Sequence, residues 1–65
     1  MQEKMKVSTA RIDAGFTQHG MAKALNVCVD TYRKWEKNPR KMPLAVAYQF
    51  CEVVGREFDA VLFLQ

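Results

Sequence analysis

Five basic side chains lie close together in the middle of this sequence, and their type and spacing suit contact with phosphate. They are Arg33, Lys34, Lys37, Arg40 and Lys41. The only acidic residue among them is Glu36, although the whole chain carries a net charge of just +3. Nine basic and four acidic residues precede Pro43, whereas one basic and three acidic residues follow it. Such a basic segment predicts a surface that faces nucleic-acid phosphates. The alternative is a solvated helix end with its loop.

The other reactive side chains form no catalytic or metal-binding pattern. The sequence has two cysteines, Cys28 and Cys51, and one histidine, His19. Without a CxxC pair, one histidine cannot complete a zinc site, so neither metal nor cofactor is expected. A Cys–His nucleophile would need a third, orienting group that is not evident. The 65 residues predict a single domain, residues 1–65, too small for a deep catalytic cleft, so we expect no enzyme. Reduced thiols in a cytoplasmic protein are the simplest interpretation, and a thiol sensor is the alternative.

Helical periodicity recurs along the chain and strand signals are weak, which predicts an all-α fold with five helices. The first helix is expected over residues 3–14 and ends at Gly15. Its inner face would hold Met5, Ser8 or Thr9, and Ile12. Thr17 is expected to cap a second helix that ends at Leu25, followed by Asn26, which tolerates a positive φ. The inner residues of this second helix would be Met21, Ala22 and Leu25.

The remaining helices follow from the same signals. A third helix is expected over residues 29–37, because Asn38-Pro39 disfavours helical geometry beyond it. Tyr32 and Trp35 would lie on its inner side, opposite Asp30, Arg33, Lys34 and Lys37. A fourth helix would begin at Pro43 and end at Gly55, and a last one would cover residues 58–63. The inner stripe of the fourth helix would be Leu44, Ala47, Phe50, Cys51 and Val54.

A longer pattern runs through the second and third predicted helices. Residues 15–36 read G-F-T-Q-x-x-M-A-x-x-L-N-V-x-x-x-T-Y-x-x-W-E, which resembles the helix-turn-helix of the phage Cro/C1-type repressor family. A weaker match continues through Val54-Gly55 to Phe58-Asp59-x-x-Leu62. The resemblance implies a five-helix, lambda-repressor-like DNA-binding domain. The sequence departs from the family at Gly20 inside a helix, at Cys28 in the usual capping position, and at Lys37-Asn38-Pro39.

The resemblance, together with side-chain chemistry, assigns the DNA contacts. An α-helix fits the major groove, and its outward residues meet base edges. The expected base-reading residues are Val29, Asp30, Arg33 and Lys34. The expected phosphate-binding residues are Gln18, Thr31, Lys37, Arg40 and Lys41.

Several of these assignments keep alternatives. Arg33 suits a base or a phosphate, and Asp30 could simply pair with Lys34. Val29 could belong to the core, and His19 is either an exposed side chain or a further phosphate contact.

The expected function is that of a sequence-specific regulator of transcription. One helix contacts few base pairs, so we expect a homodimer on a palindromic operator of double-stranded DNA. The predicted dimer seam is the apolar tail, Phe58, Val61, Leu62, Phe63 and Leu64, with packing onto the chain's own core as the alternative. The resemblance implies a repressor in a phage or mobile-element operon, including operons with anti-CRISPR genes. The alternative function is an antitoxin-like or adaptor module that binds a partner protein; no membrane is expected.

Overall fold

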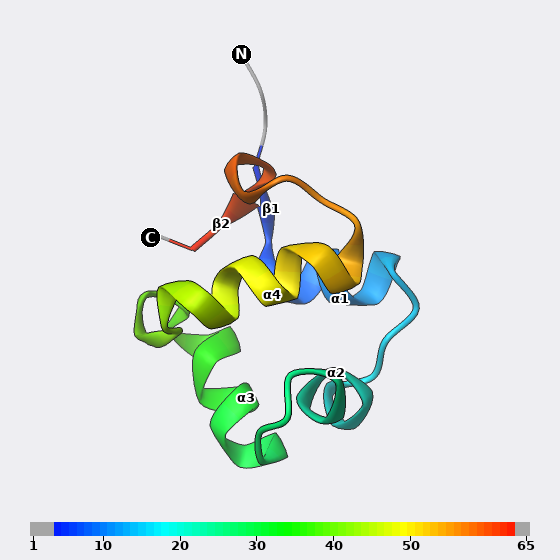
Figure 1. Ribbon diagram of the computed structural model, residues 1–65, viewed down its shortest axis with the longest axis vertical. Helices are drawn as coiled ribbons and strands as arrows, with labels where there is room; N and C mark the ends of the chain where they lie inside the picture. The colour runs from blue at the N-terminus through cyan, green and yellow to red at the C-terminus, as the bar shows by residue number, and fades with distance from the viewer. Residues whose placement is uncertain (1–3, 64–65) are drawn as a thin grey trace.

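Four α-helices and one pair of short strands make up residues 4–63, the part of the chain that the structure describes (Figure 1). The structure is a computed structural model. The helices are α1 (Val7–Asp13), α2 (Gln18–Ala24), α3 (Val29–Lys37) and α4 (Leu44–Val54). Two 3-10 turns, η1 (Pro39–Lys41) and η2 (Phe58–Ala60), precede α4 and the last strand. The strands are β1 (Met5–Lys6) and β2 (Val61–Leu62). The predicted helical class is confirmed, although the structure also contains a strand pair that was not predicted. Helices α2 and α3 lie at one end of the molecule and the strand pair lies at the other (Figure 1).

The start of the chain differs from the predicted first helix. Helix α1 begins only at Val7, because the two residues before it form β1. The inner face of α1 consists of Val7 and Ala10, each 1% exposed, whereas Ile12 is 61% exposed. The predicted inner face was therefore wrong at Ile12 and at Thr9, which is exposed. The side of α1 that meets the core is therefore the side that carries Val7 and Ala10.

The predicted last helix over residues 58–63 is also wrong. Its first three residues form the turn η2, and the chain then runs as β2 parallel to β1. Met5 pairs with Val61 and Lys6 with Leu62. Two-residue strands are too short to show the apolar alternation that identifies a strand in sequence. Residues 61 and 62 are therefore extended because they pair with β1, a contact that local sequence does not show.

The local signals around α2 and α3 are confirmed. Thr17 caps α2, and its Oγ1 accepts a hydrogen bond from the backbone N–H of Gly20 at 2.9 Å. Asn26 follows with φ of 60°, and α3 covers the predicted residues 29–37. A Cβ on Gly20 would approach Thr17 Oγ1 to 3.1 Å, so the unusual glycine leaves room for the cap.

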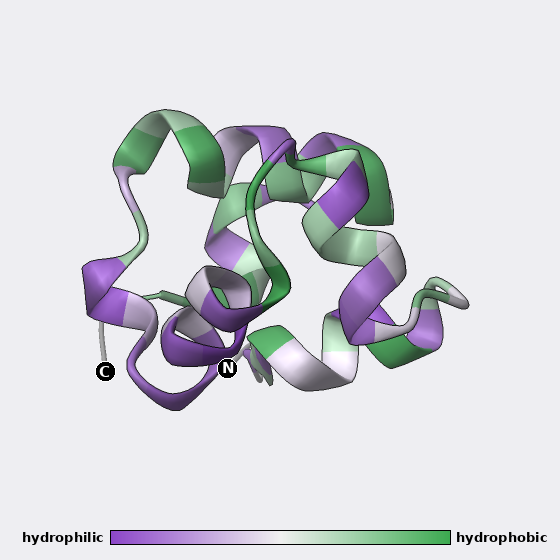
Figure 2. Ribbon diagram, turned by 90° about the horizontal axis from the view of Figure 1, so that it is seen from below, coloured by the Kyte–Doolittle hydropathy of each residue, from purple (hydrophilic) through white to green (hydrophobic). Residues whose placement is uncertain are grey.

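The core lies between the inner faces of the helices. Most of the helices are amphipathic, with both hydrophobic and hydrophilic residues along their length (Figure 2). Its largest fully buried side chains are Val7, Met21, Tyr32 and Phe50. Helix α4 contributes Ala47, Phe50, Cys51 and Val54, as predicted. The exception is Leu44, which is 63% exposed in the first turn of α4. None of the helices within residues 4–63 is long and apolar enough to cross a membrane.

Replacing Thr17 by alanine should lower the free energy of unfolding by about 1 kcal/mol, because it removes the hydroxyl that caps α2. Urea unfolding measures this loss. Thr9→Ala is the matched control, since Thr9 is an exposed threonine within α1. The control should stabilise slightly, because alanine is the better helix former. Equal effects of the two substitutions would contradict a capping role for Thr17.

Candidate nucleic-acid interface

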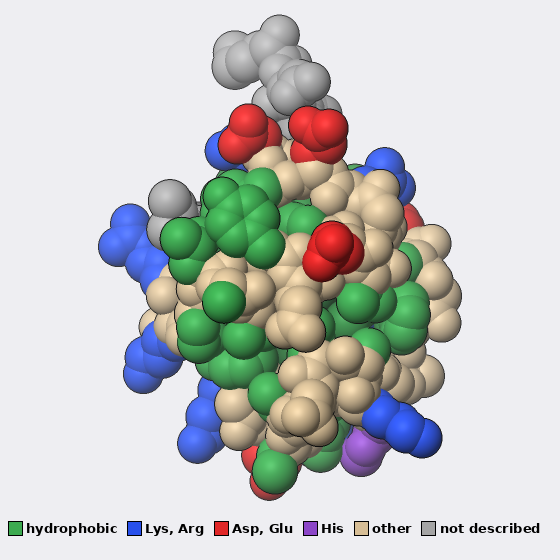
Figure 3. Space-filling model, viewed as in Figure 1, with side chains coloured by type: hydrophobic (Ala, Val, Ile, Leu, Met, Phe, Trp, Pro, Cys, Tyr) green, Lys and Arg blue, Asp and Glu red, His purple; other side chains and the backbone are tan. Residues whose placement is uncertain are grey.

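Helix α3 separates its side chains cleanly into an inner and an outer side. Tyr32 is 0% exposed and Trp35 is 9% exposed, so both rings belong to the core. The outer side carries Asp30, Arg33, Lys34 and Lys37, all exposed. Lys and Arg side chains gather along the edge of the molecule beside α3 and the turn after it (Figure 3). The basic residues of positions 33–41 thus give this edge of the molecule a positive charge.

The turn between α2 and α3 brings these helices into close contact. Ala22 is 2% exposed, and its carbonyl accepts a hydrogen bond from the N–H of Val27 at 2.9 Å. Leu25, at 4% exposure, fixes the end of α2 in the core. The left-handed Asn26 reverses the chain between them. Small size at Ala22 and the unusual backbone at Asn26 thus set the angle at which α3 projects.

Gln18 lies at the start of α2 and links that helix to α3. Its Nε2 donates to Glu36 Oε1 at 2.9 Å, and its Oε1 accepts from Arg33 Nε at 3.2 Å. An amide nitrogen carries two N–H groups, so Nε2 keeps one for another acceptor. The predicted phosphate ligand Gln18 is therefore held in place by the protein itself.

Glu36 joins three helices through its carboxylate. Oε2 accepts from Arg11 Nε of α1 and from the Tyr32 hydroxyl of α3, each at 2.6 Å. The side chains of Arg11 and Glu36 are only 12% and 9% exposed. Arg11 also donates to the carbonyl of Phe16 at 2.8 Å, which fixes the connection between α1 and α2. Sequence reasoning missed this ion pair, because nothing local connects residues 25 positions apart.

The environment shifts the pKa of both acidic partners. Burial raises the pKa of the Glu36 carboxyl. Hydrogen bonds from Tyr32, Gln18 and Arg11, together with the charge of Arg11, lower it by more than burial raises it, so the pKa lies below its usual 4.5. Burial, and then the neighbouring carboxylate of Glu36, raise the pKa of the Tyr32 phenol. Near neutral pH the carboxylate is thus charged and the phenol is protonated, as their hydrogen bond requires.

Asp30 pairs with Arg33, at 3.5 Å between Oδ1 and an η nitrogen, rather than with Lys34. The side chain of Asp30 is 84% exposed, and such surface ion pairs contribute little stability. Val29 is half-buried and packs against the core, as the core alternative predicted, while part of its side chain remains exposed.

The basic turn after α3 is anchored by a residue that the sequence analysis did not select. Met42 is 6% exposed and follows η1, whose backbone is closed by a hydrogen bond from Lys41 N to the Asn38 carbonyl at 3.0 Å. Arg40 and Lys41 remain exposed. Their side chains thus lie on a defined 3-10 turn that continues directly from α3.

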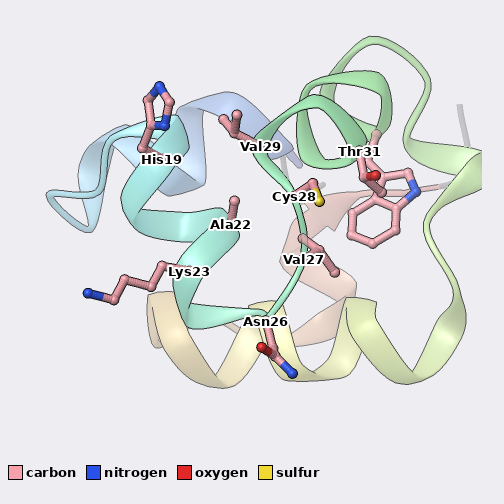
Figure 4. Close-up of a pocket in the computed structure, with 9 residues that line it drawn as sticks. His19, Ala22, Lys23, Asn26, Val27, Cys28, Val29 and Thr31 are labelled. Carbon is pink, nitrogen blue, oxygen red and sulfur yellow. The ribbon is translucent and has the colours of Figure 1, made fainter.

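A shallow groove of about 730 Å³ follows the turn between α2 and α3 (Figure 4). His19 and Lys23 line it from α2, and Val29 and Thr31 line it from α3. Lys23, a basic residue of α2 that lines this groove, was not among the predicted DNA contacts. Cys28, at the N-cap of α3, is exposed and makes no side-chain capping bond, as expected from its type. Cys51 is buried, which raises the pKa of its thiol.

The apolar tail packs largely onto its own chain. Val61 is 2% exposed and Phe63 is 4% exposed, with the ring of Phe63 edge-on to Phe50 at 6.0 Å. Phe58 and Leu62 are half-buried, and Leu64 lies outside the described residues. For Val61 and Phe63 the structure thus favours the alternative that the tail packs onto the chain's own core.

Comparison with models of protein families, with curated proteins and with solved structures finds no match to this chain. The described residues contain no cluster of three or more potential metal ligands. The site is therefore defined by its own geometry: a cationic helix whose inner side is fixed in the core and whose outer side is open.

Acidification should weaken the fold through Glu36. Because the folded-state pKa of Glu36 is lowered, its contribution is fully present above the usual 4.5 and is lost as the pH falls through the lowered value. Urea unfolding at successive acidic pH values measures this loss. Glu36→Gln cannot titrate at this position, so its stability should vary less over the same range. Parallel pH profiles for the two proteins would contradict the assignment.

Proposed function

We propose that this protein binds double-stranded DNA sequence-specifically, with α2 and α3 as a helix-turn-helix of the Cro/C1 type. The observation that carries the proposal is the two-sided character of α3. Its rings are fixed in the core, while its basic side chains remain exposed on the opposite side. A helix presented in this way has the dimensions and charge to enter the major groove.

Base contacts are assigned to the first half of α3 and to Lys34. The methyl groups of Val29 can pack on a thymine methyl, and Asp30 can accept from cytosine N4. Lys34 lies one turn beyond Asp30 and can donate to guanine O6 and N7. Within the described residues the Lys34 ammonium has no hydrogen-bond or ion-pair partner, whereas the neighbouring Arg33 is held in place by Gln18 and Asp30.

Phosphate contacts are assigned to the residues around this helix. They are Gln18, Thr31, Lys37, Arg40 and Lys41. Gln18 retains a free amide N–H, and the two basic residues of η1 extend the positive surface beyond the end of α3. Backbone contacts of this kind fix the register of the protein on the duplex without selecting its sequence.

Lys41→Ala should weaken binding to all duplexes alike, because we assign Lys41 to a phosphate. The slope of log affinity against log salt concentration should flatten by about one unit. Titrations of an operator and of an unrelated duplex over a salt series measure both effects. A loss confined to one sequence would contradict the assignment.

The proposal includes a homodimer, because a single α3 contacts too few base pairs to select an operator in a genome. A two-fold symmetric dimer would match a palindromic site, with half-sites about 34 Å or a small multiple of a helical turn apart. Of the tail residues, Phe58 is the best placed for contact with a second copy. Its ring stacks on Tyr48 at 4.7 Å, and Tyr48 is 53% exposed on α4.

The biological role that fits these features is repression in the cytoplasm. A dimer on an operator that overlaps a promoter would exclude polymerase, as in a phage or mobile-element operon. Such operons include those with anti-CRISPR genes. A partner-binding adaptor would not need a cationic α3, so we place it second.

Selection of binding sites from randomised duplexes tests the proposal. We expect enrichment of a short palindromic sequence, whose symmetry and spacing report the dimer directly. A variant that lacks two of the three basic side chains of α3, Lys34→Ala together with Lys37→Ala, serves as the control and should enrich the selected sequence less strongly. Failure of the wild-type chain to bind any duplex at low salt would refute a DNA-binding function.

A further inference from the structure

Three helices meet around a hollow beside the outer side of α3. The hollow has a volume of about 410 Å³ and is lined by Ser8 of α1, Gln18 of α2 and three residues of α3. Those three are Arg33, Glu36 and Lys37. A smaller hollow of about 220 Å³ shares Ser8, Glu36 and Lys37 and continues to Lys6. Ser8 and Lys6 are distant in sequence from α3, so only the fold brings them to this surface.

The groups that face this hollow are mainly hydrogen-bond donors. Lys37 supplies an ammonium, Ser8 a hydroxyl, and Gln18 the amide N–H that Glu36 does not use. Arg33 donates through Nε to Gln18 and through one η nitrogen to Asp30, which leaves further N–H groups of its guanidinium free. Converging donors with two cations suit a tetrahedral anion with several oxygens.

Glu36, the one carboxylate of the hollow, does not oppose an anion strongly. Its charge is balanced by Arg11 at 2.6 Å, and its side chain is only 9% exposed. Its two oxygens already accept from Arg11, Tyr32 and Gln18. Glu36 lines the hollow and accepts from Gln18 Nε2, and Gln18 Oε1 in turn accepts from Arg33 Nε.

We propose that this hollow, called here the α1–α3 hollow, binds one backbone phosphodiester of the DNA. The inference rests on the proposed function and deepens it. It assigns Arg33 to a phosphate rather than to a base, and it adds Ser8 as a ligand of the same phosphate. Base readout by a basic side chain then falls to Lys34.

The hydrogen bond between Arg33 Nε and Gln18 supports this division of roles. It turns the guanidinium toward the start of α2, a predicted phosphate-binding position. Asp30 holds the same guanidinium by a long, exposed contact of 3.5 Å, which a phosphate can replace at little cost. Arg33 is thus preorganised beside the other donors before DNA arrives.

The inference is tested by removing the charge of one DNA phosphate at a time. A series of operator duplexes is prepared, each with one methylphosphonate in place of one phosphate. The methylphosphonate at the phosphate that the hollow binds should weaken wild-type binding by about tenfold, because charge-assisted hydrogen bonds to that phosphate are lost. The same substitution should weaken the binding of Arg33→Ala and of Ser8→Ala by a smaller factor, since each variant has already lost one of the donors to that phosphate. Lys34→Ala should still show the full effect there.

Two controls keep the readout specific. Thr9→Ala removes an exposed hydroxyl next to Ser8, and it should respond to every methylphosphonate as the wild-type chain does. Circular dichroism establishes that each variant is folded before its affinity is measured. Ser8→Ala also provides a second test of the hollow should Arg33→Ala fail to fold.

The outcomes separate this inference from the proposed function. Specific binding in which no phosphate is coupled to Arg33 or Ser8 overturns the inference and leaves the DNA-binding function intact. A changed base preference in Arg33→Ala, with Ser8→Ala unchanged, has the same meaning. A wild-type chain that binds no duplex at all overturns both.

Discussion

Glu36→Ala is expected to lower the free energy of unfolding by about 3 kcal/mol, the low end of the cost of removing one partner from a buried ion pair. The substitution leaves Arg11 largely buried, at 12% side-chain exposure, without its carboxylate. It also removes the acceptor of the Tyr32 hydroxyl and of the Gln18 amide. A domain of this size has only roughly 3–5 kcal/mol of stability from its core, so the variant should be close to unfolding at room temperature.

Urea unfolding followed by circular dichroism measures the effect of Glu36→Ala. Glu52→Ala is the matched control, because Glu52 is an exposed glutamate on α4 and should change stability little. A double-mutant cycle with Arg11→Ala separates the ion pair from the other hydrogen bonds. A loss below about 1 kcal/mol, as for an ordinary surface charge, would show that this carboxylate does not hold the helices together.

Lys34→Ala is expected to cost about 1–3 kcal/mol of specific binding free energy per half-site and to abolish preference at one base position. Lys34 is exposed on the outer side of α3, one turn beyond Asp30, and its ammonium can reach a guanine edge. In a symmetric dimer the substitution occurs twice, so the operator should lose more affinity than any single contact explains.

Parallel site selections with the wild-type chain and with Lys34→Ala measure this change of preference. Lys41→Ala is the comparison, because removing a proposed phosphate contact should reduce affinity without altering the selected sequence. Non-specific binding at low salt should change by a similar amount in both variants, since each loses one positive charge. An unaltered sequence profile for Lys34→Ala would move base readout to other residues of α3.

The candidate site shows which of its parts a sequence can reveal. The exposed basic residues and the buried Tyr32 and Trp35 follow from the 3.6-residue period of one helix, so their sides could be predicted. The residues from other helices that hold the side chains of α3 in place could not be predicted. The contacts of Gln18 with Glu36 and Arg33 join residues 18 and 15 positions apart, and the Arg11–Glu36 pair spans 25. No local preference encodes such distances.

The same physical division runs through the whole chain. The sequence alone determined the bounds of α3, the Thr17 cap and the left-handed Asn26, because each depends on interactions within one helical turn. Only the tertiary structure decided that the two chain ends pair as β1 and β2, that Ile12 and Leu44 face solvent, and that Phe63 enters the core. These outcomes depend on which surfaces meet after the helices pack, and short segments at the chain ends carry too little local preference to resist that packing.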